Sequence, residues 1–396
     1  MRYTVRSNQA ECTGCGACVS ICPKNAITMK PDDEGFLYPS VDSALCVNCD
    51  LCEKRCPVGK DVPAAEQRVF GAQHRDEQVR ASSSSGGVFT ALARNTFARG
   101  GVVFGAVFDE NLRVEHIGAF HEAEMAAMRG SKYVQSDAAD AIAHAASLLE
   151  RGIPVLFCGT PCQIAGLKAK LGGRHEESLT TVDFVCHGVP SPGVFASYLR
   201  ELEKKYGSRP VAYTFRDKRK GWKDFMAVAT FEDGSEHAGD QRTEPFLYGF
   251  LQNLYLRPAC AACTAYRGSH RPSDITMADL WGAPKVCPEK DDDTGLSLVF
   301  ANTEKGREIL AQCSEELLHD DIALCDPMLR ENPSLFAPAK HHEKREAFFA
   351  YYRKHGFDSK RVMKLLMGPG LPERIVRRIA HLPYGAMRRL RALFKK

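Results

Sequence analysis

Two runs of cysteine near the N-terminus have a spacing that suits iron–sulfur ligation. Both have the pattern CxxCxxCxxxCP; the first comprises Cys12, Cys15, Cys18 and Cys22, and the second comprises Cys46, Cys49, Cys52 and Cys56. The two-residue gaps let three thiolates wrap one face of a cubic cluster, while Gly14 and Gly16 let the backbone approach the sulfur atoms. Thiolates at this spacing hold 4Fe-4S clusters, which transfer single electrons. The pattern therefore indicates one-electron chemistry, but it names no substrate.

The fourth cysteine of each run is expected to serve the cluster of the other run. This is the ligand pattern of bacterial two-cluster ferredoxins, whose spacing the repeat has. We therefore predict one cluster on Cys12, Cys15, Cys18 and Cys56, and a second on Cys46, Cys49, Cys52 and Cys22. Zinc knuckles or disulfides are the alternative, but eight cysteines and two prolines in this repeat fit them poorly.

The composition is that of a folded protein with more than one domain. The chain has 396 residues, of which 44% are hydrophobic and 26% are charged, so we expect two or three domains. The sequence shows neither a signal peptide nor an apolar segment of the roughly 18 residues that could span a bilayer. We therefore expect a cytoplasmic protein, in which 16 cysteines are better explained by metal than by disulfides.

The region after the linker at residues 60–67 reads as alternating strands and helices. Strands are predicted at residues 102–108, 113–120, 153–157 and 182–186, and helices after Gly87, at residues 138–151, at residues 163–171, and from an N-cap at Ser191. Strand–helix–strand order implies parallel strands, whose carboxyl ends bind ligands in open α/β sheets. Cys158, Cys162 and Cys186 are expected at these ends.

A further CxxC motif, Cys260 and Cys263, needs two more ligands to hold a metal. Cys162 and Cys186 are available, so spacing alone allows a third cluster. Two alternatives stay open at this point, a nucleophilic Cys162 activated by His187 and buried structural cysteines.

Two turns rich in small residues could bind an anion. The first, residues 82–87, contains four serines and two glycines before a helix start; the second, residues 129–136, combines Gly130, Ser131, Lys132 and Tyr133. An ordinary Ser-capped helix explains the first equally well. The basic segment FRDKRKGWK, residues 215–223, either binds an anionic substrate or an acidic ferredoxin, or is a solvated turn.

Taken in order, these motifs resemble the coenzyme F420 hydrogenase/dehydrogenase beta-subunit family with a ferredoxin module fused in front. The resemblance extends over roughly residues 1 to 325 and rests on SSSSGGVFTALA, GGVVFGAVF, RGSKYVQS, VLFCGTPCQIAGLKA, CHGVPSP, FRDKRKGW, the CxxC at Cys260, and SDITMADLWG. It implies a protein that binds FAD, passes electrons between clusters and FAD, and exchanges a hydride with an organic substrate or with coenzyme F420.

The resemblance also implies the site residues. FAD contacts would fall on Ser84, Ser85, Gly86, Gly87, Gly130, Ser131, Lys132 and Tyr133, and a third 4Fe-4S cluster on Cys162, Cys186, Cys260 and Cys263. Cys158 could compete as a ligand, Cys287 is a spare thiol, and Cys313 and Cys325 are expected in the core. A hydride needs an accompanying proton, for which His187 is the first candidate and Asp279 the second.

The expected fold is an α+β ferredoxin-like dicluster domain followed by an α/β flavin- and iron–sulfur-binding domain and a helical C-terminal extension. The expected boundaries are residues 1–60 for the dicluster domain, 61–150 for the N-terminal part of the flavin-binding region, 151–325 for the C-terminal beta-subunit region with the third cluster, and 326–396 for the extension.

The expected function is that of a ferredoxin- or coenzyme F420-linked, flavin-dependent oxidoreductase, with ferredoxin or another redox protein as its partner. The alternative is an electron-transfer subunit that relays electrons to a separate catalytic partner. Relatives of this architecture reduce coenzyme F420, reduce chlorophyll pigments, or are encoded with surface-polysaccharide genes, so the substrate stays open.

The basic charge of the chain is concentrated at its C-terminal end. Residues 371–396 carry eight Arg or Lys and one Glu, with apolar residues at helical spacing. Such a helix either lies on an anionic membrane surface, here the surface of the inner membrane, or docks on a partner protein. An ordinary helix that covers the core is the third possibility. A nucleic-acid-binding protein would carry its basic excess on a folded domain, so nucleic acid is not an expected ligand.

Overall fold

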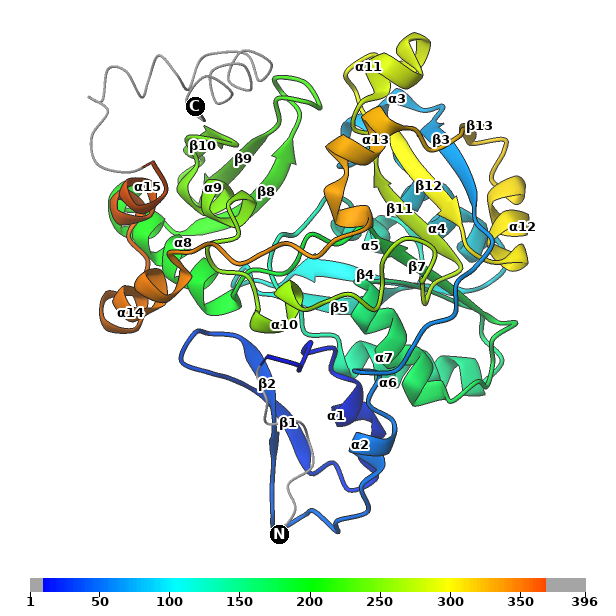
Figure 1. The fold of residues 1–396 in the computed structure, drawn as a ribbon, viewed down its shortest axis with the longest axis horizontal. Helices are drawn as coiled ribbons and strands as arrows, with labels where there is room; N and C mark the ends of the chain where they lie inside the picture. The colour runs from blue at the N-terminus through cyan, green and yellow to red at the C-terminus, as the bar shows by residue number, and fades with distance from the viewer. Residues whose placement is uncertain (1–9, 368–396) are drawn as a thin grey trace.

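The computed structural model describes residues 10–367, and an eight-stranded mixed sheet lies at its centre (Figure 1). In spatial order its strands are β13 (Leu317–Asp321), β3 (Arg68–His74), β12 (Ser297–Ala301), β11 (Ile275–Asp279), β7 (Leu179–Phe184), β6 (Val155–Cys158), β4 (Val102–Phe108) and β5 (Val114–Ala119). The pairs β4–β6, β6–β7 and β7–β11 are parallel, and the remaining pairs are antiparallel. The strands therefore come from both halves of the expected flavin- and iron–sulfur-binding region.

The parallel centre of the sheet confirms the expected strand–helix–strand order. Cys158 ends β6, and Cys186 follows β7 by two residues, so both cysteines lie at the same edge of the sheet. The antiparallel strands β3, β12 and β13 were not expected. They come from both ends of the region, at distances along the sequence that local periodicity does not connect.

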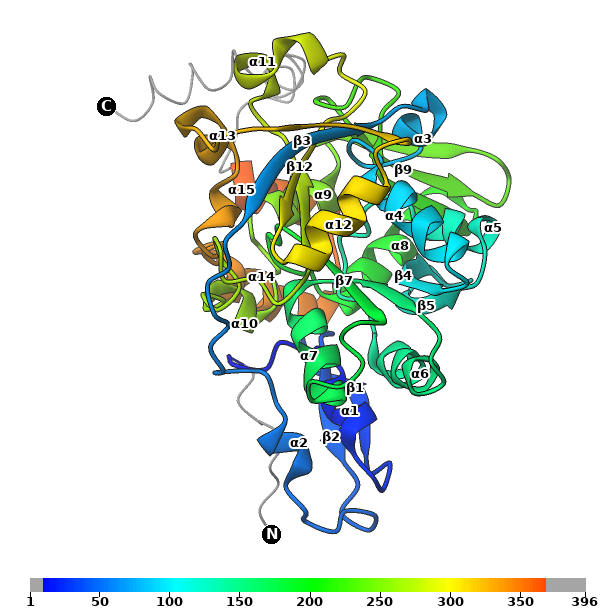
Figure 2. The same ribbon diagram turned by 90° about the vertical axis from the view of Figure 1, so that its right-hand side faces the viewer.

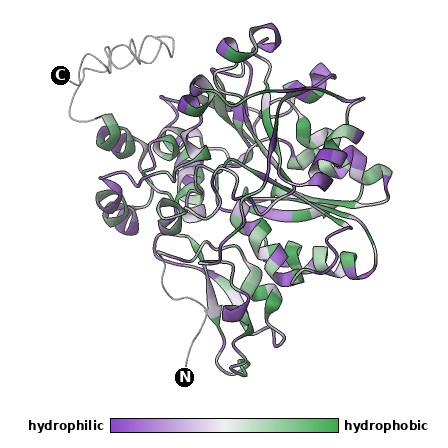
Figure 3. Ribbon diagram, turned by 45° about the vertical axis from the view of Figure 1, so that its right-hand side comes forward, coloured by the Kyte–Doolittle hydropathy of each residue, from purple (hydrophilic) through white to green (hydrophobic). Residues whose placement is uncertain are grey.

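Two pairs of helices cover the faces of this sheet. One face carries α4 (Val88–Ala98) and α12 (Glu304–Gln312), and Leu92 and Ile309 are buried there against the strands. The other face carries α6 (Ala139–Glu150) and α7 (Pro161–Leu171), which bury Ile164 against Phe157 of β6. Figure 3 shows hydrophobic residues in green along the central strands and hydrophilic ones in purple on the outer turns of the helices.

The helices that follow β6 and β7 begin at strong local signals. Thr160 caps α7 in a capping box with Gln163, and Gly172 ends the helix in the left-handed region at φ 65°. Ser191 caps α8 (Pro192–Tyr206), and Pro192 takes its first position. Each cap places the strand-to-helix turn, and with it Cys162 or Cys186, at a fixed position.

A second core lies beside the large sheet and is dominated by aromatic rings. It is formed by α8, by the antiparallel strands β8 (Pro210–Asp217), β9 (Met226–Phe231) and β10 (Glu236–Asp240), and by the helices α9 (Pro245–Leu251), α14 (Arg345–His355) and α15 (Ser359–Met367). Phe195, Phe246 and Phe349 are among its fully buried rings. Helices α14 and α15 belong to the expected C-terminal extension, and Phe348, Phe349, Phe357 and Val362 anchor it in this core.

Short elements connect these layers. They are α3 (Glu77–Ala81), α5 (Glu122–Met125), η1 (Ala126–Met128), α10 (Pro258–Ala261), α11 (Ala283–Val286), η2 (Pro288–Lys290), α13 (Asp326–Glu331) and η3 (Pro333–Leu335).

The N-terminal module projects as a lobe below the large sheet (Figures 1 and 2). It consists of α1 (Ala17–Ile21), the antiparallel strands β1 (Ile27–Pro31) and β2 (Leu37–Val41), and α2 (Leu51–Lys54). The sequence suggested that a linker separates this module from the rest. The structure instead inserts the β1–β2 turn into the aromatic core, where Phe36 is fully buried near Phe349. The module is therefore docked rather than only tethered.

A buried ion pair fastens this turn to the C-terminal helix α14. Arg345 donates to both carboxylate oxygens of Glu34, and Arg353 Nη2 lies 3.1 Å from Glu34 Oε1. Burial raises the pKa of the Glu34 carboxyl, and Arg345 opposes that rise. Gly35 lies so close to Gly193 of α8 that a side chain at either position would meet backbone. The first and last described parts of the chain are thus in direct contact.

No helix within residues 10–367 is both long and apolar enough to cross a membrane. The basic tail, residues 371–396, lies outside the described residues, so its amphipathic helix stays a prediction.

Replacing Glu34 with Gln should destabilise the protein, because the buried Arg345 then lacks its main counter-ion. We expect a loss of about 3 kcal/mol in the free energy of unfolding, measured by urea denaturation. The matched control is Asp33→Asn, because Asp33 pairs with Arg353 but is 65% exposed. That change should cost less than about 1 kcal/mol. Equal urea midpoints for the two variants would contradict a stabilising role for the Glu34–Arg345 ion pair.

Candidate functional site

The cysteines of the two N-terminal runs line two cavities. The first is lined by Cys12, Cys15, Cys18, Cys52 and Cys56, and the second by Cys22, Cys46, Cys49 and Cys52. Each encloses about 470 Å³, part of it open to solvent. The fourth cysteine of each run therefore lies with the leading cysteines of the other run.

These cavities suit clusters better than single metal ions. Among residues 10–367, no three His, Cys, Asp or Glu groups converge closely enough to hold one ion. Zinc would need its sulfur ligands about 2.3 Å away, whereas each thiolate of a 4Fe-4S cluster binds a different iron. Gly14 and Gly16 have φ values of 67° and 82°, so the loop wraps the first cavity in a conformation that glycine adopts readily.

Burial in the first cavity disfavours the thiolate form of Cys18. Burial raises the pKa of Cys18 to about 12, and the neighbouring Cys12, Cys56 and Cys52 raise it too. Iron bound to these sulfur atoms offsets both effects, so metal binding and thiol ionisation are coupled here.

Four later cysteines form a third group. Cys162 lies in the first turn of α7, Cys186 follows β7, and Cys260 and Cys263 lie in and after α10. Burial raises the pKa of Cys186, and negative charge on Cys260, Cys162 and Cys263 adds to the rise, so the four sulfur atoms are neighbours. For the same reasons the pKa of Cys260 is raised to about 12.

Two buried arginines face this third group. Arg267 Nη1 donates to the carbonyl of Cys186 at 2.9 Å, and its Nε donates to the carbonyl of Cys263 at 3.1 Å. Arg271 is 5% exposed, yet neither of its Nη atoms has a hydrogen-bond partner among the described residues. Asp183, Cys186 and Cys263 are its negative neighbours. Its Nε donates to the Gly268 carbonyl at 3.3 Å. Two buried nitrogen atoms without acceptors are costly, and a negatively charged cluster on these cysteines would compensate their charge.

The third group lies against the first cavity. Negative charge on Cys162 contributes to the raised pKa of Cys15, after burial, which is the main cause. A Cβ at Gly166 of α7 would lie 3.1 Å from Cys15 Sγ, so glycine at this position lets α7 pass close to Cys15 without displacing its side chain.

The remaining cysteines lie elsewhere. Cys158 has Asp183 and Lys132 as charged neighbours, and it packs against the core beneath α4. Cys287 is buried near Cys325 in a separate cluster. Cys313 is a core residue, as expected, and so is the partly buried Cys325. None of these four thiols is a neighbour of the third group.

The two serine- and glycine-rich turns meet. Ser84 Oγ accepts from the backbone N–H of Ser131 at 2.6 Å and lies 2.9 Å from the Ser131 hydroxyl. A Cβ at Gly130 would meet no atom of the described chain within 4 Å, so there is open space beside this turn. The backbone N–H of Gly86 is already bound to Ser297 Oγ at 3.0 Å. Gly86 therefore serves close packing on the sheet, while Ser84 and Gly130 lie at the open junction.

Arg216 of the basic segment holds this junction together. Its Nη1 donates to Tyr133 Oη at 3.1 Å and to Asp279 Oδ2 at 2.9 Å, and its Nη2 donates to the Ser84 carbonyl at 3.1 Å. Its Nε is buried without a partner in the described part of the chain. Lys218 donates to the Ser85 carbonyl at 3.0 Å, and burial lowers its pKa to about 8. Arg216 and Lys218 are thus structural parts of the junction, whereas Arg219 and Lys220 of the same segment are exposed.

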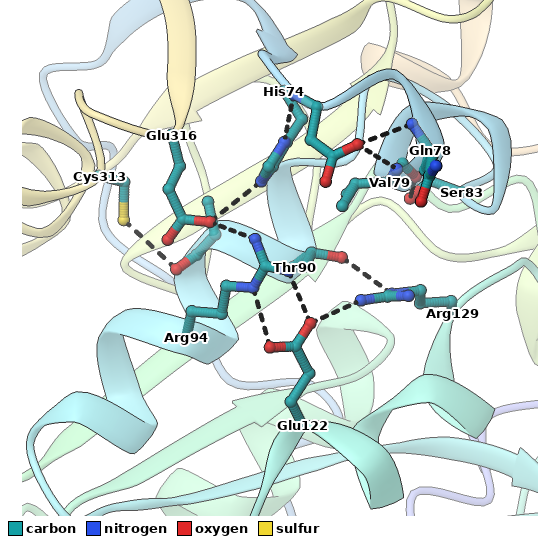
Figure 4. A network of polar contacts seen from close by, with 12 residues as sticks. His74, Gln78, Val79, Ser83, Thr90, Arg94, Glu122, Arg129, Cys313 and Glu316 are labelled. Atoms are coloured by element: carbon teal, nitrogen blue, oxygen red, sulfur yellow. Dashed lines mark hydrogen bonds and ion pairs between the residues drawn. The ribbon is translucent and has the colours of Figure 1, made fainter.

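A polar network beneath the junction fixes both turns to the sheet (Figure 4). Arg129, which precedes Gly130, donates to Thr90 of α4 at 3.2 Å and to Glu122 at 3.2 Å. Arg94 of α4 binds Glu122 at 2.7 Å and Glu316 at 2.7 Å. The helix that follows one turn is therefore tied to the residue that precedes the other.

The two candidate proton donors have different surroundings. His187 Nε2 lies 2.5 Å from Asn253 Oδ1, and because an amide oxygen only accepts, we assign the hydrogen to Nε2. Burial lowers the pKa of His187, which favours the neutral ring. Asp279 accepts from Arg216 and from Trp222 Nε1 at 3.2 Å. Its oxygens are thus occupied by donors, which suits positioning Arg216 better than releasing a proton.

Sequence reasoning missed the arginines around the cysteines. Arg257 precedes the CxxC motif, and Arg267 and Arg271 follow it. All three are buried, although arginine is mostly exposed in proteins. Their spacing around Cys260 and Cys263 was the available signal, but burial depends on contacts with residues up to 245 positions away.

Three family models match the chain in the order of its parts. A 4Fe-4S dicluster domain matches residues 11–60. The N-terminal domain of the coenzyme F420 hydrogenase/dehydrogenase beta subunit matches residues 69–143, and the C-terminal domain of that subunit matches residues 154–320.

Two curated proteins and one solved structure are similar to this chain. A subunit of the F(420)H(2) dehydrogenase of Methanosarcina mazei is 25% identical over 321 residues, which are 77% of this chain and 83% of that protein. An uncharacterized ferredoxin of Methanocaldococcus jannaschii is 38% identical over 57 residues, 14% of this chain and 73% of that protein. A chain of the xenon-derivatised F420-reducing NiFe hydrogenase complex from Methanosarcina barkeri is 18% identical, with a TM-score of 0.48, covering 69% of this chain and 91% of that one.

The matched domains agree with the motifs read from the sequence and with the cysteine-lined cavities. The chain therefore belongs to the coenzyme F420 hydrogenase/dehydrogenase beta-subunit family, carries a 4Fe-4S dicluster domain at its N-terminus, and is an iron–sulfur protein of the oxidoreductase type.

Proposed function

We propose that this protein is a flavin-dependent oxidoreductase that moves electrons between three 4Fe-4S clusters and FAD and exchanges a hydride with an organic substrate or coenzyme F420. The observation that carries the proposal is the position of the third cysteine group, between the first cavity and the serine–glycine junction. Cys162 neighbours Cys15. Towards the junction, the ring of Phe250 lies between the two sites. Its centroid is 5.2 Å from that of His187, the residue after Cys186, and 4.8 Å from that of Tyr133 in the junction.

The cysteines would hold the clusters in three groups. They are Cys12, Cys15, Cys18 and Cys56; Cys46, Cys49, Cys52 and Cys22; and Cys162, Cys186, Cys260 and Cys263. Clusters of this kind exchange one electron at a time, and FAD, when bound, couples such steps to two-electron chemistry. The unpaired Nη atoms of Arg271 support an anionic group at the third set.

The junction residues would hold the flavin. The contacts proposed from the motifs are Ser84, Ser85, Gly86, Gly87, Gly130, Ser131, Lys132 and Tyr133. The open space beside Gly130 and the unpaired Nε of Arg216 support a ligand here. Burial lowers the pKa of Lys132 to about 8, and an anionic ligand would favour the charged amine.

His187 is the better-placed proton donor of the two residues named from the sequence. It lies next to Cys186 and shares Phe250 with Tyr133. Asp279 is proposed instead to orient Arg216, since it accepts a hydrogen bond from the guanidinium that also binds Ser84 and Tyr133.

A second function, electron relay to a separate catalytic partner, is favoured by what the similar proteins are named. One is a dehydrogenase subunit, and the other is a chain of a hydrogenase complex. Reduction of coenzyme F420 or another hydride acceptor by the isolated, flavin-loaded chain would favour the first function. Cluster reduction without any hydride transfer would favour the relay.

The first test is an iron count. Anaerobic reconstitution should give about twelve iron atoms per chain, four for each cluster. Cys162→Ser should lower the count to about eight, because it removes a ligand of the third group only.

Cys158→Ser is the matched control, since Cys158 lies only four residues from Cys162 but outside the group. It should leave the iron count unchanged. A loss of iron in Cys158→Ser, with none in Cys162→Ser, would show that the third ligand set is assigned wrongly.

The second test is flavin affinity. Arg216→Gln should weaken FAD binding at least tenfold, about 1.4 kcal/mol, because it detaches Tyr133 and Ser84 from one another. The measurement is an FAD titration followed by fluorescence, with iron content as a check on folding.

Arg219→Gln is the control for this test. Arg219 lies three residues further along but is 43% exposed, and it pairs with Asp217 and Glu236 rather than with the junction. Equal FAD dissociation constants for both variants would place the flavin away from the junction.

A further inference from the structure

We propose that Arg257 is a shared electrostatic control for two clusters, the one on Cys12, Cys15, Cys18 and Cys56 and the one on the third cysteine group. Its positive charge would raise both reduction potentials together. The difference between the two potentials, which drives the electron step between the clusters, would then change little. The inference rests on the proposed function, because it requires the third cluster.

Arg257 binds the first cluster's ligand loop directly. The residue is 0% exposed, its Nε donates to the Cys12 carbonyl at 2.8 Å, and its Nη2 lies 3.7 Å from Cys12 Sγ. The guanidinium also lies over the ring of Tyr38, with Cζ 4.0 Å from the ring centroid. Because arginine stays protonated in proteins, this is a permanent positive charge beside a cluster ligand.

The same residue belongs to the third cysteine group. Its carbonyl accepts from the backbone N–H of Cys260 at 3.0 Å, and its own N–H donates to Val189 at 2.9 Å, which fixes it to the segment after Cys186. Its positive charge opposes the effect of burial on both Cys162 and Cys260. One guanidinium thus faces sulfur atoms of both groups.

Among residues 10–367, no carboxylate accepts a hydrogen bond from this guanidinium. Its acceptors are the carbonyls of Cys12 and Leu37, the Oε1 of Gln135 and the Cys12 sulfur. A cluster becomes more negative by one charge on reduction, so a nearby uncompensated cation favours the reduced form. Because the site is buried, solvent screens this effect weakly.

Arg271 provides the contrast. It also lies near a cluster site, and the cysteines that act most strongly on it, Cys186 and Cys263, both belong to the third group. The second N-terminal cluster, on Cys46, Cys49, Cys52 and Cys22, is distinguished by its hydrogen bonds: within residues 10–367 the Arg257 guanidinium donates to Cys12 of the first set and to no cysteine of the second. The reduction potentials of the three clusters should therefore respond differently to a change at Arg257.

The test is a redox titration of the reconstituted full chain, followed by EPR, with Arg257→Gln and Gln135→Glu. The second variant keeps Arg257 and adds a carboxylate where Oε1 now accepts from Nη1 at 3.0 Å. If the Arg257→Gln protein does not take up iron, the Gln135→Glu variant still tests the proposal. The Nε2 that it replaces has no hydrogen-bond partner in the described chain, so little structure is lost.

Both variants should shift the reduction equilibria of the first and third clusters at least tenfold towards the oxidised form, which is about 59 mV for one electron. The reduction potential of the second N-terminal cluster, on Cys46, Cys49, Cys52 and Cys22, should stay unchanged and serves as an internal reference. Arg271→Gln should shift the third cluster alone. Unchanged potentials in a fully iron-loaded Gln135→Glu protein, or a shift of only one cluster, would overturn the proposal.

The iron count separates this inference from the proposed function. A wild-type chain that binds about eight irons lacks the third cluster, and the proposed function then fails before Arg257 is tested. About twelve irons with unshifted potentials would leave that function intact and remove the inference.

Discussion

The close packing of the N-terminal module on α7 is the contact on which the rest of this structure depends. Electron transfer needs cofactor sites that are near one another, and here Gly166 eases the close approach of α7 to Cys15, which brings one cysteine-lined cavity beside another cysteine group. The burial of Phe36 and the ion pair between Glu34 and Arg345 stabilise this packing of the module. Phe250 connects this arrangement to the serine–glycine junction, since its ring lies near His187, beside Cys186, and near Tyr133 of the junction.

Buried charge has a consistent logic across these sites. Burial raises the pKa of thiols such as that of Cys186, and it makes guanidinium groups such as Arg257 and Arg271 costly. Under the proposed function the two effects would offset one another, because the thiolates and sulfide of bound clusters would supply negative charge beside the arginines. The unpaired nitrogens of Arg271 are therefore best understood together with Cys186 and Cys263 rather than as a packing defect.

The sequence predicted the parts of the fold that are encoded locally. The cysteine repeat, the caps at Ser191 and Gly172, and the parallel strands around Cys158 all follow from residues within a few positions of one another. Features that join distant segments were not predicted, such as the antiparallel strands β3, β12 and β13 and the insertion of Phe36. The same limit applies to the site. The basic segment around Arg216 was recognised, but its hydrogen bonds to Tyr133, Ser84 and Asp279 join four separate stretches of chain.

The ion pair between Glu34 and Arg345 also links the two ends of the described chain to the cofactor sites. Glu34 lies in the module at one end of the described chain, and Arg345 lies in α14 near the other end. The complete docking contact therefore needs both the module and the folded C-terminal helices. Docking in turn brings Cys15 against α7, which covers one side of the first cavity. Because cluster binding and folding are coupled at such sites, the C-terminal extension supports the first cysteine-lined cavity through the contact it makes with Glu34, although none of its described residues is a candidate ligand.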